Sequence, residues 1–230
     1  MFCGIIGGDM TAVKYIFIQM GDRSSFERIK DCLPMIEITV ILLLIGICNL
    51  HLVTGTFSDS LIFYPAGFFS GRWWLAFTHP FVHVSWYHLF LDVTAFVMLY
   101  RGLEDMDIIK KILIIMACLV SSIAVPLIGP SSIQTSGLCG LSGVAHGLMV
   151  FCVTDMILTE KGRTAGLSGF VLIISKTVFE LYTGHAFFSF MHAGMCGSPV
   201  VSCHAGGVVG GLMISLLHVR RRISCRSLNE

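Results

Sequence analysis

Residues 108–128 read IIKKILIIMACLVSSIAVPLI and carry no charge after Lys111. As a helix, an apolar stretch of this length is long enough to cross the ~30 Å hydrocarbon core of a bilayer. Stretches of the same kind recur along the chain, at about 35–53, 84–100, 141–158, 167–183 and 200–219. The sequence therefore predicts an all-α polytopic membrane protein with six transmembrane helices.

The composition agrees with a chain that lipid surrounds. Of the 230 residues, 55% are apolar and only 13% are charged, whereas a soluble domain carries about 25% charged residues. We therefore expect the lipid bilayer to be a partner. The net charge of +1 says nothing about nucleic acid, and the sequence has no basic tract interleaved with aromatic residues, so we expect no nucleic-acid partner. No pattern in the sequence predicts an oligomeric state.

Basic residues predict the topology of the helices. Of the 15 Lys and Arg residues, only Arg72 and Lys176 lie outside four segments. The four segments are a leader at 1–34, connections at 101–111 and 160–163, and a tail at 220–230. The leader and the tail flank a membrane domain at 35–219, and the two connections lie within it. Because basic segments stay in the cytoplasm, we expect both termini to be cytoplasmic. The loops 54–83, 129–140 and 184–199 are then expected to face outward.

Residues with chemical functions form four clusters. The clusters are Gly140-Leu141-Ser142-Gly143, His204-Ala205-Gly206-Gly207, His83 with His88 and Asp92, and Lys176 with Glu180. In the predicted topology the first three clusters lie toward the outer ends of their helices. Their side chains are therefore expected at one depth in the membrane, where they can meet.

Ser142 stands between glycines where the fourth predicted helix begins. One interpretation is an N-terminal cap with flexible neighbours. The other is a nucleophile, because Gly140 and Gly143 let a substrate backbone approach. The helix N-terminus also offers N–H groups and a dipole that stabilise an oxyanion. This cluster alone leaves both interpretations open.

His204 is a histidine within a predicted membrane helix, which by itself suggests a function. A core histidine bonded to a backbone carbonyl is the alternative. Gly207 and Gly211 form a small-xxx-small pattern that lets another helix pack closely. Close packing against the fourth helix would bring the imidazole to the Ser142 hydroxyl, as a Ser–His dyad requires.

The histidines around the second helix allow three interpretations. His79, His83 and His88 are potential metal ligands, but no fourth ligand is evident. Polar packing near the membrane interface is the second interpretation. The third is a set of hydrogen-bond donors for an oxyanion hole.

Together these motifs resemble the rhomboid family of intramembrane serine proteases over about residues 35–219. The matching motifs are Gly140-Leu141-Ser142-Gly143, His204-x-x-Gly207-x3-Gly211, His83-x4-His88-x3-Asp92 and, more weakly, Arg72-Trp73 and Gly102-Leu103-Glu104. The resemblance implies a six-transmembrane-helix rhomboid-like bundle that cleaves membrane-anchored protein substrates near the outer face of the bilayer.

The resemblance also assigns roles to residues. Ser142 would attack the scissile carbonyl, and His204 would take and return the proton. His88 and the position of Asp92 would join the Ser142 backbone N–H around the oxyanion. Supporting positions are His83, His146, Gly140, Gly143, Gly207, Lys176 and Glu180. No metal and no organic cofactor is implied.

Two residues depart from the rhomboid pattern. The family has asparagine at the position of Asp92, and an ionised carboxylate would oppose a developing oxyanion. Asp92 would either stay protonated and donate a hydrogen bond, or pair with His88 one turn earlier. His146 replaces an aromatic residue that stacks on the catalytic histidine, and we expect it to support His204 by stacking or hydrogen bonding rather than to replace it as base.

Lys176 and Glu180 lie one turn apart in the fifth predicted helix. A buried ion pair is the simpler interpretation. However, Ser-Gly-x-x-His-Gly at 142–147 and Lys-x-x-x-Glu at 176–180 resemble the bacterial rhombosortase branch. That resemblance implies substrates with a short C-terminal anchor after a small-residue motif such as Gly-Gly. It also implies location in a bacterial inner (cytoplasmic) membrane.

Three alternatives remain open, one about the cysteines and two about the function of the protein. The chain has nine cysteines without a Cys-x-x-Cys pair, which argues against a zinc knuckle or a disulfide scaffold. Cys139 and Cys203 would nevertheless come close if Ser142 meets His204, and a disulfide between them is one alternative. A proteolytically inactive rhomboid-like binding or quality-control protein is the second. A small transporter or channel is the third, although most polar residues gather near one face.

Overall fold

The computed structural model describes residues 23–55, 59–129, 132–187 and 200–227, with side chains described from Leu33 onward. Parts of the predicted leader, of the three outward loops and of the tail lie outside the described residues. Within the described ranges the chain is helical and contains no strand. This confirms the predicted all-α class.

The helices fall into long and short groups. The long helices are α2 (Arg23–Cys48), α6 (Trp86–Arg101), α7 (Ile108–Ile128), α9 (Ser142–Ile157), α10 (Arg163–Thr183) and α11 (Ser202–Ser227). The short helices are α3 (His51–Thr54), η1 (Asp59–Leu61), α4 (Pro65–Phe69), α5 (Leu75–Thr78), η2 (His79–Phe81) and α8 (Ile133–Ser136).

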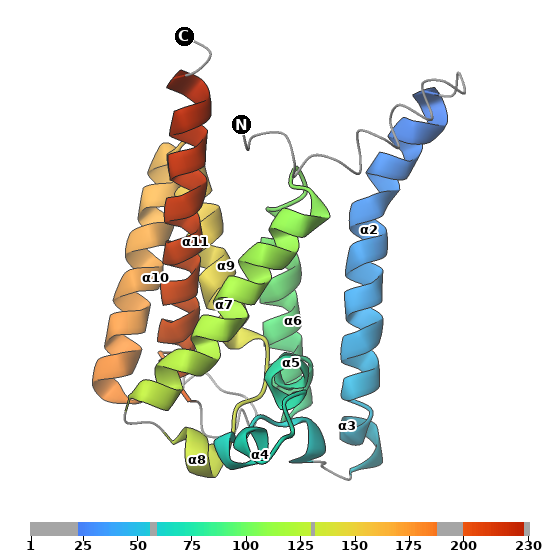
Figure 1. Ribbon diagram of the computed structural model, residues 1–230, viewed down its shortest axis with the longest axis vertical. Helices are drawn as coiled ribbons and strands as arrows, with labels where there is room; N and C mark the ends of the chain where they lie inside the picture. The colour runs from blue at the N-terminus through green and yellow to red at the C-terminus, as the bar shows by residue number, and fades with distance from the viewer. Residues whose placement is uncertain (1–22, 56–58, 130–131, 188–199, 228–230) are drawn as a thin grey trace. The chain divides into compact units, whose positions relative to one another are not determined.

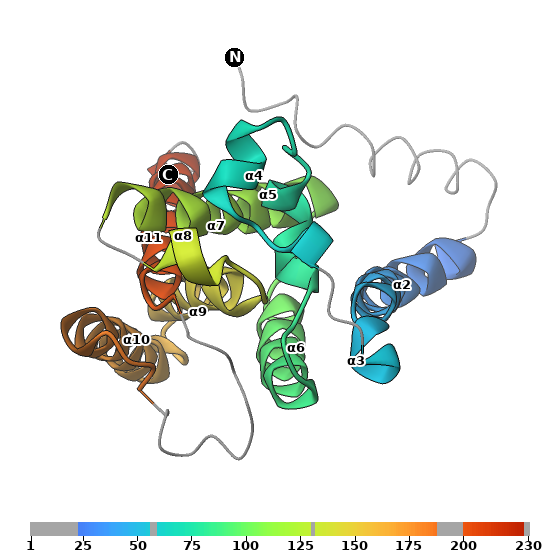
Figure 2. The same ribbon diagram turned by 90° about the horizontal axis from the view of Figure 1, so that it is seen from below.

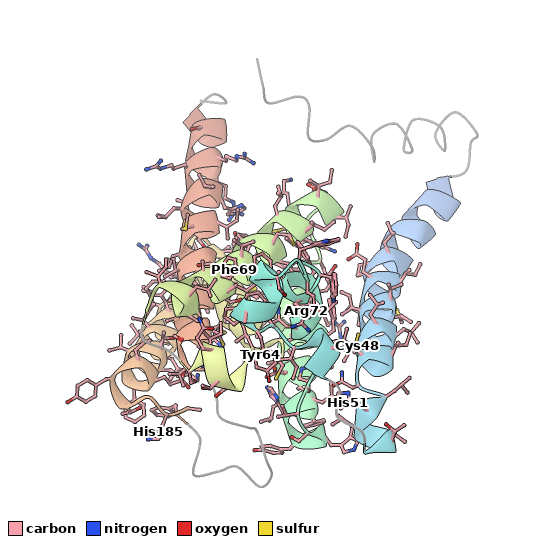
Figure 3. All side chains as sticks on the ribbon, turned by 60° about the horizontal axis from the view of Figure 1, so that its bottom comes forward. Cys48, His51, Tyr64, Phe69, Arg72 and His185 are labelled. Carbon is pink, nitrogen blue, oxygen red and sulfur yellow. The ribbon has the colours of Figure 1, made fainter. Side chains whose placement is uncertain are left out.

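The chain divides into two compact units, Met1–Leu44 and Ile45–Glu230. Among the described residues, the first unit consists of α2 up to Leu44. The second unit contains the end of α2 and all later helices. Figure 3 marks Tyr64, Phe69 and Arg72 on the connection between α3 and α5, and His185 just after α10.

Helix α9 is the centre of the second unit. It packs against α6, α7, α10 and α11, and α11 also packs along α7. Figures 1 and 2 show these four helices around α9. Buried apolar side chains line α9 on all sides, among them Val144, Leu148, Val150 and Phe151. A helix that is apolar all round is expected at the core of a membrane bundle.

Four helices among the described residues are long and apolar enough to cross a membrane. They are Leu33–Thr54, Ile108–Ile128, Arg163–Thr183 and Ser202–Arg222. The segments Leu75–Phe81 and Trp86–Arg101 together would make a fifth, although they are bent by 98°. Helix α9 has only 16 residues, about 24 Å at a rise of ~1.5 Å per residue. The predicted count of six membrane-crossing helices therefore stays a prediction.

A small apolar cluster holds the connections next to the start of α9. Its buried members are Phe63, Leu75, Ile133, Leu138, Val200 and Cys203. Phe63 and Leu138 also form an isolated antiparallel bridge, with N–H···O distances of 3.0 and 2.8 Å. The connection before α6 is thereby fixed to the segment that leads into Ser142.

Candidate active site

Ser142 is the first residue of α9, and the segment before it is held by backbone contacts. The Gly140 N–H donates to the His79 carbonyl oxygen at 3.0 Å. Gly140 has φ +95°, and a Cβ there would lie 2.7 Å from Asp92 Oδ2 and 2.8 Å from His88 Cε1. Glycine is therefore required at position 140 both by the backbone conformation and by the space available.

Close helix packing brings His204 to Ser142. A Cβ at Gly207 of α11 would collide with the Gly143 carbonyl oxygen of α9, and one at Gly211 would collide with that of Gly147. The two glycine pairs are four residues apart on both helices, so they form one continuous line of contact. The small-xxx-small pattern thus packs against the fourth predicted helix, as expected.

Ser142 and His204 meet inside the bundle. His204 Nε2 lies 3.2 Å from Ser142 Oγ, and the His204 side chain is 9% exposed. This distance allows a hydrogen bond and a proton transfer from the hydroxyl to the imidazole. The structure therefore brings together the two residues that the sequence suggested for a dyad.

His146 lies one turn after Ser142 and packs flat on His204. The two rings have centroids 4.0 Å apart and planes inclined by 5°. His146 Nδ1 lies 2.7 Å from the Ser142 carbonyl oxygen. Because a carbonyl oxygen only accepts, Nδ1 carries the hydrogen of this bond. The position of His146 agrees with the supporting part expected for it.

Glu180 is the site residue whose contact with His204 the sequence did not reveal. Glu180 Oε2 lies 2.8 Å from His204 Nδ1, on the side of the ring that faces away from Ser142. Glu180 Oε1 accepts from Lys176 Nζ at 2.6 Å and from the Phe187 backbone N–H at 2.9 Å. The ion pair within α10 was expected, but its contact with the histidine of another helix was not.

Asp92 occupies the place where donors for an oxyanion would gather. Its Oδ2 accepts from the Ser142 backbone N–H at 3.0 Å and lies 3.2 Å from His88 Nε2. His83 Nε2 lies 3.5 Å from the same oxygen. His88 and Asp92 thus form the pair that was one of the two arrangements considered for this carboxylate. The Ser142 N–H and His88 thus converge on the Asp92 carboxylate, and their role around an oxyanion stays a prediction.

His83 is held in place by two residues that follow α2, Asn49 and His51. It is fully buried, and its backbone N–H donates to Asn49 Oδ1 at 2.8 Å. His51 Nε2 lies 2.9 Å from the His83 carbonyl oxygen. His79 instead directs Nδ1 to the Leu75 carbonyl oxygen at 3.1 Å, so it hydrogen-bonds within its own turn.

One group of side chains in the described part of the chain has the make-up of a metal site. His146, Glu180 and His204 each offer a ligand atom within 4.8 Å of the others. Lys176 Nζ, however, lies 2.7 Å from His146 Nε2 as well as 2.6 Å from Glu180 Oε1. An ammonium group therefore already supplies the positive charge between these ligands.

The two cysteines beside the site are free thiols. Cys139 precedes Ser142 by three residues, and Cys203 directly precedes His204. The structure contains both as free cysteines. The disulfide that was considered between them is therefore not present in this structure.

Comparisons with known proteins give one family match. A family model described as the Rhomboid domain matches residues 70–221, which is more than half of the chain. The matched range contains every site residue described above except Asn49 and His51, which hold His83 in place. A search of curated proteins found no significant match.

Proposed function

The chain belongs to the rhomboid family, a family mostly of intramembrane serine proteases, and it is a multi-pass membrane protein. We propose that it is an active intramembrane serine endopeptidase with Ser142 as nucleophile and His204 as general base. The observation that carries the proposal is the 3.2 Å contact between His204 Nε2 and Ser142 Oγ. A nucleophile within hydrogen-bond reach of a base is the arrangement that acyl transfer needs.

The geometry supports a two-step mechanism. Ser142 Oγ attacks the scissile carbonyl carbon while His204 Nε2 takes the hydroxyl proton. The imidazolium then gives this proton to the leaving amine as the C–N bond breaks. A water molecule, deprotonated by His204, hydrolyses the acyl-enzyme ester and restores the Ser142 hydroxyl. The Ser142 N–H and His88 Nε2, which both lie within 3.2 Å of Asp92 Oδ2, would turn to the oxyanion as donors.

The length of α9 supports chemistry below the membrane surface. The helix covers about 24 Å, whereas the hydrocarbon core is ~30 Å thick. If the end of α9 at Ile157 lies near one surface, Ser142 lies several ångströms inside the other. The exposed Trp73, Trp74 and Trp86 are suited to the interface on the Ser142 side.

We extend the proposal to topology and substrates. The basic connections support cytoplasmic termini, with a leader at 1–34, the membrane domain at 35–219 and a tail at 220–230. The site would then open toward the outer face of a bacterial inner membrane. The resemblance of 142–147 and 176–180 to rhombosortases supports membrane-anchored substrates with a short C-terminal anchor after a Gly-Gly-type motif.

The proposal is tested with the full chain in proteoliposomes. A fluorophosphonate probe is expected to label the protein, and a reporter with a C-terminal membrane anchor after Gly-Gly is expected to be cleaved. Ser142→Ala should abolish both, and His204→Ala should slow both. Ser168→Ala changes an exposed serine of α10 and should leave both unchanged. Labelling that survives in Ser142→Ala would contradict the assignment of the nucleophile.

The contact between Asp92 and Ser142 favours a second candidate function. A carboxylate that accepts the Ser142 N–H at 3.0 Å would oppose an oxyanion in the same place. This observation fits a proteolytically inactive rhomboid-like binding or quality-control protein. Absence of labelling in both the wild type and Asp92→Asn, with the protein folded, would favour this function.

A further inference from the structure

Polar side chains close a ring through Ser142 in the interior of the bundle. Ser142 Oγ contacts His204 at 3.2 Å, His204 contacts Glu180 at 2.8 Å, and Glu180 contacts Lys176 at 2.6 Å. The ring returns from Lys176 to His146 at 2.7 Å, and from His146 to the Ser142 carbonyl oxygen at 2.7 Å. Three helices, α9, α10 and α11, contribute to it.

The chemistry of the partners assigns each hydrogen in the ring. The Ser142 carbonyl only accepts, so His146 Nδ1 is the protonated nitrogen. His146 Nε2 faces the Lys176 ammonium, which only donates, so Nε2 is unprotonated and His146 is neutral. The lone pair on His146 Nε2 is therefore engaged by Lys176 and is not available to take a proton from Ser142.

The same reasoning fixes which nitrogen of a neutral His204 ring carries the hydrogen. Glu180 accepts from Lys176 and from the Phe187 N–H through Oε1, which leaves Oε2 as the acceptor for His204 Nδ1–H. Nε2 of the neutral ring is then unprotonated and faces the Ser142 hydroxyl. This is the tautomer in which a histidine can take a proton from serine.

We propose that Glu180 is the carboxylate of a Ser142–His204–Glu180 triad, acting as a positioning residue that holds His204 in its proton-accepting tautomer. The inference rests on the proposed function and deepens it. When His204 becomes an imidazolium, the carboxylate 2.8 Å away stabilises the new positive charge. Contacts to Lys176 and to the Phe187 N–H keep Glu180 from turning away.

Lys176 makes this carboxylate compatible with burial. Glu180 is 1% exposed, and an unpaired carboxylate in such a place is strongly disfavoured. The ammonium group of Lys176 balances the charge from within α10, one turn earlier. The ligand-like cluster of His146, Glu180 and His204 therefore uses a side-chain cation in the place where a metal ion would otherwise bind.

The test compares Glu180→Gln with Glu160→Gln in the full chain in proteoliposomes. Glu160 is an exposed residue of the connection between α9 and α10 and serves as the matched control. The readout is the second-order rate of Ser142 labelling by a fluorophosphonate between pH 5 and 9. Glu180→Gln is expected to lower this rate by about 10²-fold or more, toward the ~10⁴-fold loss known for triads that lose their carboxylate.

The pH profile separates positioning from a merely structural effect. The groups around His204 that titrate or carry charge are Glu180 and Lys176 of α10, His146 of α9, Cys203 of α11 and Asp92 of α6. Of these, only Glu180 changes in the variant. Loss of its negative charge disfavours the imidazolium, so the acid limb of the profile should move to lower pH. A structural defect would lower the rate without moving this limb.

Each outcome decides one question. Wild-type rate and profile in Glu180→Gln, with Ser142→Ala unlabelled, would overturn the triad and leave the proposed protease intact. Labelling that survives in Ser142→Ala would overturn the protease itself. If Glu180→Gln does not fold, the double variant Lys176→Met/Glu180→Gln removes the ion pair as a unit. Slow labelling in that folded variant supports the triad, and wild-type labelling overturns it.

Discussion

Replacing Asp92 by asparagine is expected to keep or raise the activity. Asp92 Oδ2 accepts the Ser142 N–H at 3.0 Å, and in the proposed mechanism that N–H turns to the oxyanion in the transition state. A carboxylate resists this change more than a neutral amide does, because hydrogen bonds to charged groups are stronger. In Asp92→Asn the amide oxygen can still accept, and the amide N–H₂ can donate to the oxyanion.

The size of the effect follows from the bond that has to be given up. A hydrogen bond to a charged group contributes about 1.5–3 kcal/mol and a neutral one about 0.5–1.5 kcal/mol. The difference of about 1–1.5 kcal/mol corresponds to a rate gain of about fivefold to tenfold. Asp92→Ala, in contrast, should lose activity, because His88, 3.2 Å away, loses the side chain that orients it and no donor replaces the carboxylate.

The rates are measured by fluorophosphonate labelling and by cleavage of the anchored reporter in proteoliposomes. Asp155→Asn is the matched control, because Asp155 pairs with His218 and Arg222 near the other end of α9. This control should label at the wild-type rate. An Asp92→Asn protein that folds with wild-type stability but neither labels nor cleaves would refute the reasoning.

Three further changes test other parts of the site. Gly207→Ala should destabilise the fold by about 1–3 kcal/mol, because its methyl group would overpack against Gly143. The effect is measured by thermal unfolding. Gly46→Ala is the control, because a Cβ at Gly46 meets nothing within 4 Å. His146→Ala should slow cleavage by about twofold to tenfold, the scale of a lost ring contact of about 0.5–1.5 kcal/mol. Complete inactivity of this variant, alongside cleavage by His204→Ala near the wild-type rate, would reassign the base. Burial raises the pKa of the Cys139 thiol from 9.0 to about 12, so its thiolate at neutral pH is about a thousandfold scarcer than that of an ordinary thiol. Iodoacetamide should therefore modify Cys139 at least about a hundredfold more slowly in the native protein than after denaturation, as read by mass spectrometry.

Much of this site was predictable because its signals are local. Short patterns indicate where one helix begins and where another can pack. The first is Ser142 between glycines, and the second is Gly207 followed by Gly211. The family resemblance then connected these patterns, because they occur along the chain in the order that the family has. The contact of Glu180 with His204 has no such local signal. Its spacing from Lys176 indicates only a pair on one helix face, and the rotation of α10 that turns this face toward α11 is a property of packing.

Helix lengths show a second limit of the sequence. The apolar stretches at 84–100 and 141–158 looked like complete spans. The structure places α6 at Trp86–Arg101, after a bend of 98°, and α9 at Ser142–Ile157, so both predicted ranges hold to within two residues. Glycines at 140 and 143 mark the start of α9, but hydropathy continues through them. A hydropathy pattern does not reveal this bend, nor whether a helix as short as α9 crosses a whole bilayer.

Asp92 contacts the Ser142 backbone N–H and Glu180 contacts His204, and in the proposed mechanism these two carboxylates have opposite effects on catalysis. Glu180 faces His204, where positive charge would develop, and Asp92 faces the Ser142 N–H, where negative charge would develop. Two unit charges about 4 Å apart interact by about 4 kcal/mol at an effective dielectric constant of about 20. Neutralising Glu180 should therefore slow the reaction, and neutralising Asp92 should not. If the buried polar network had a purely structural role, both variants would lose stability. Such a role gives no reason why one variant should slow the reaction and the other should not.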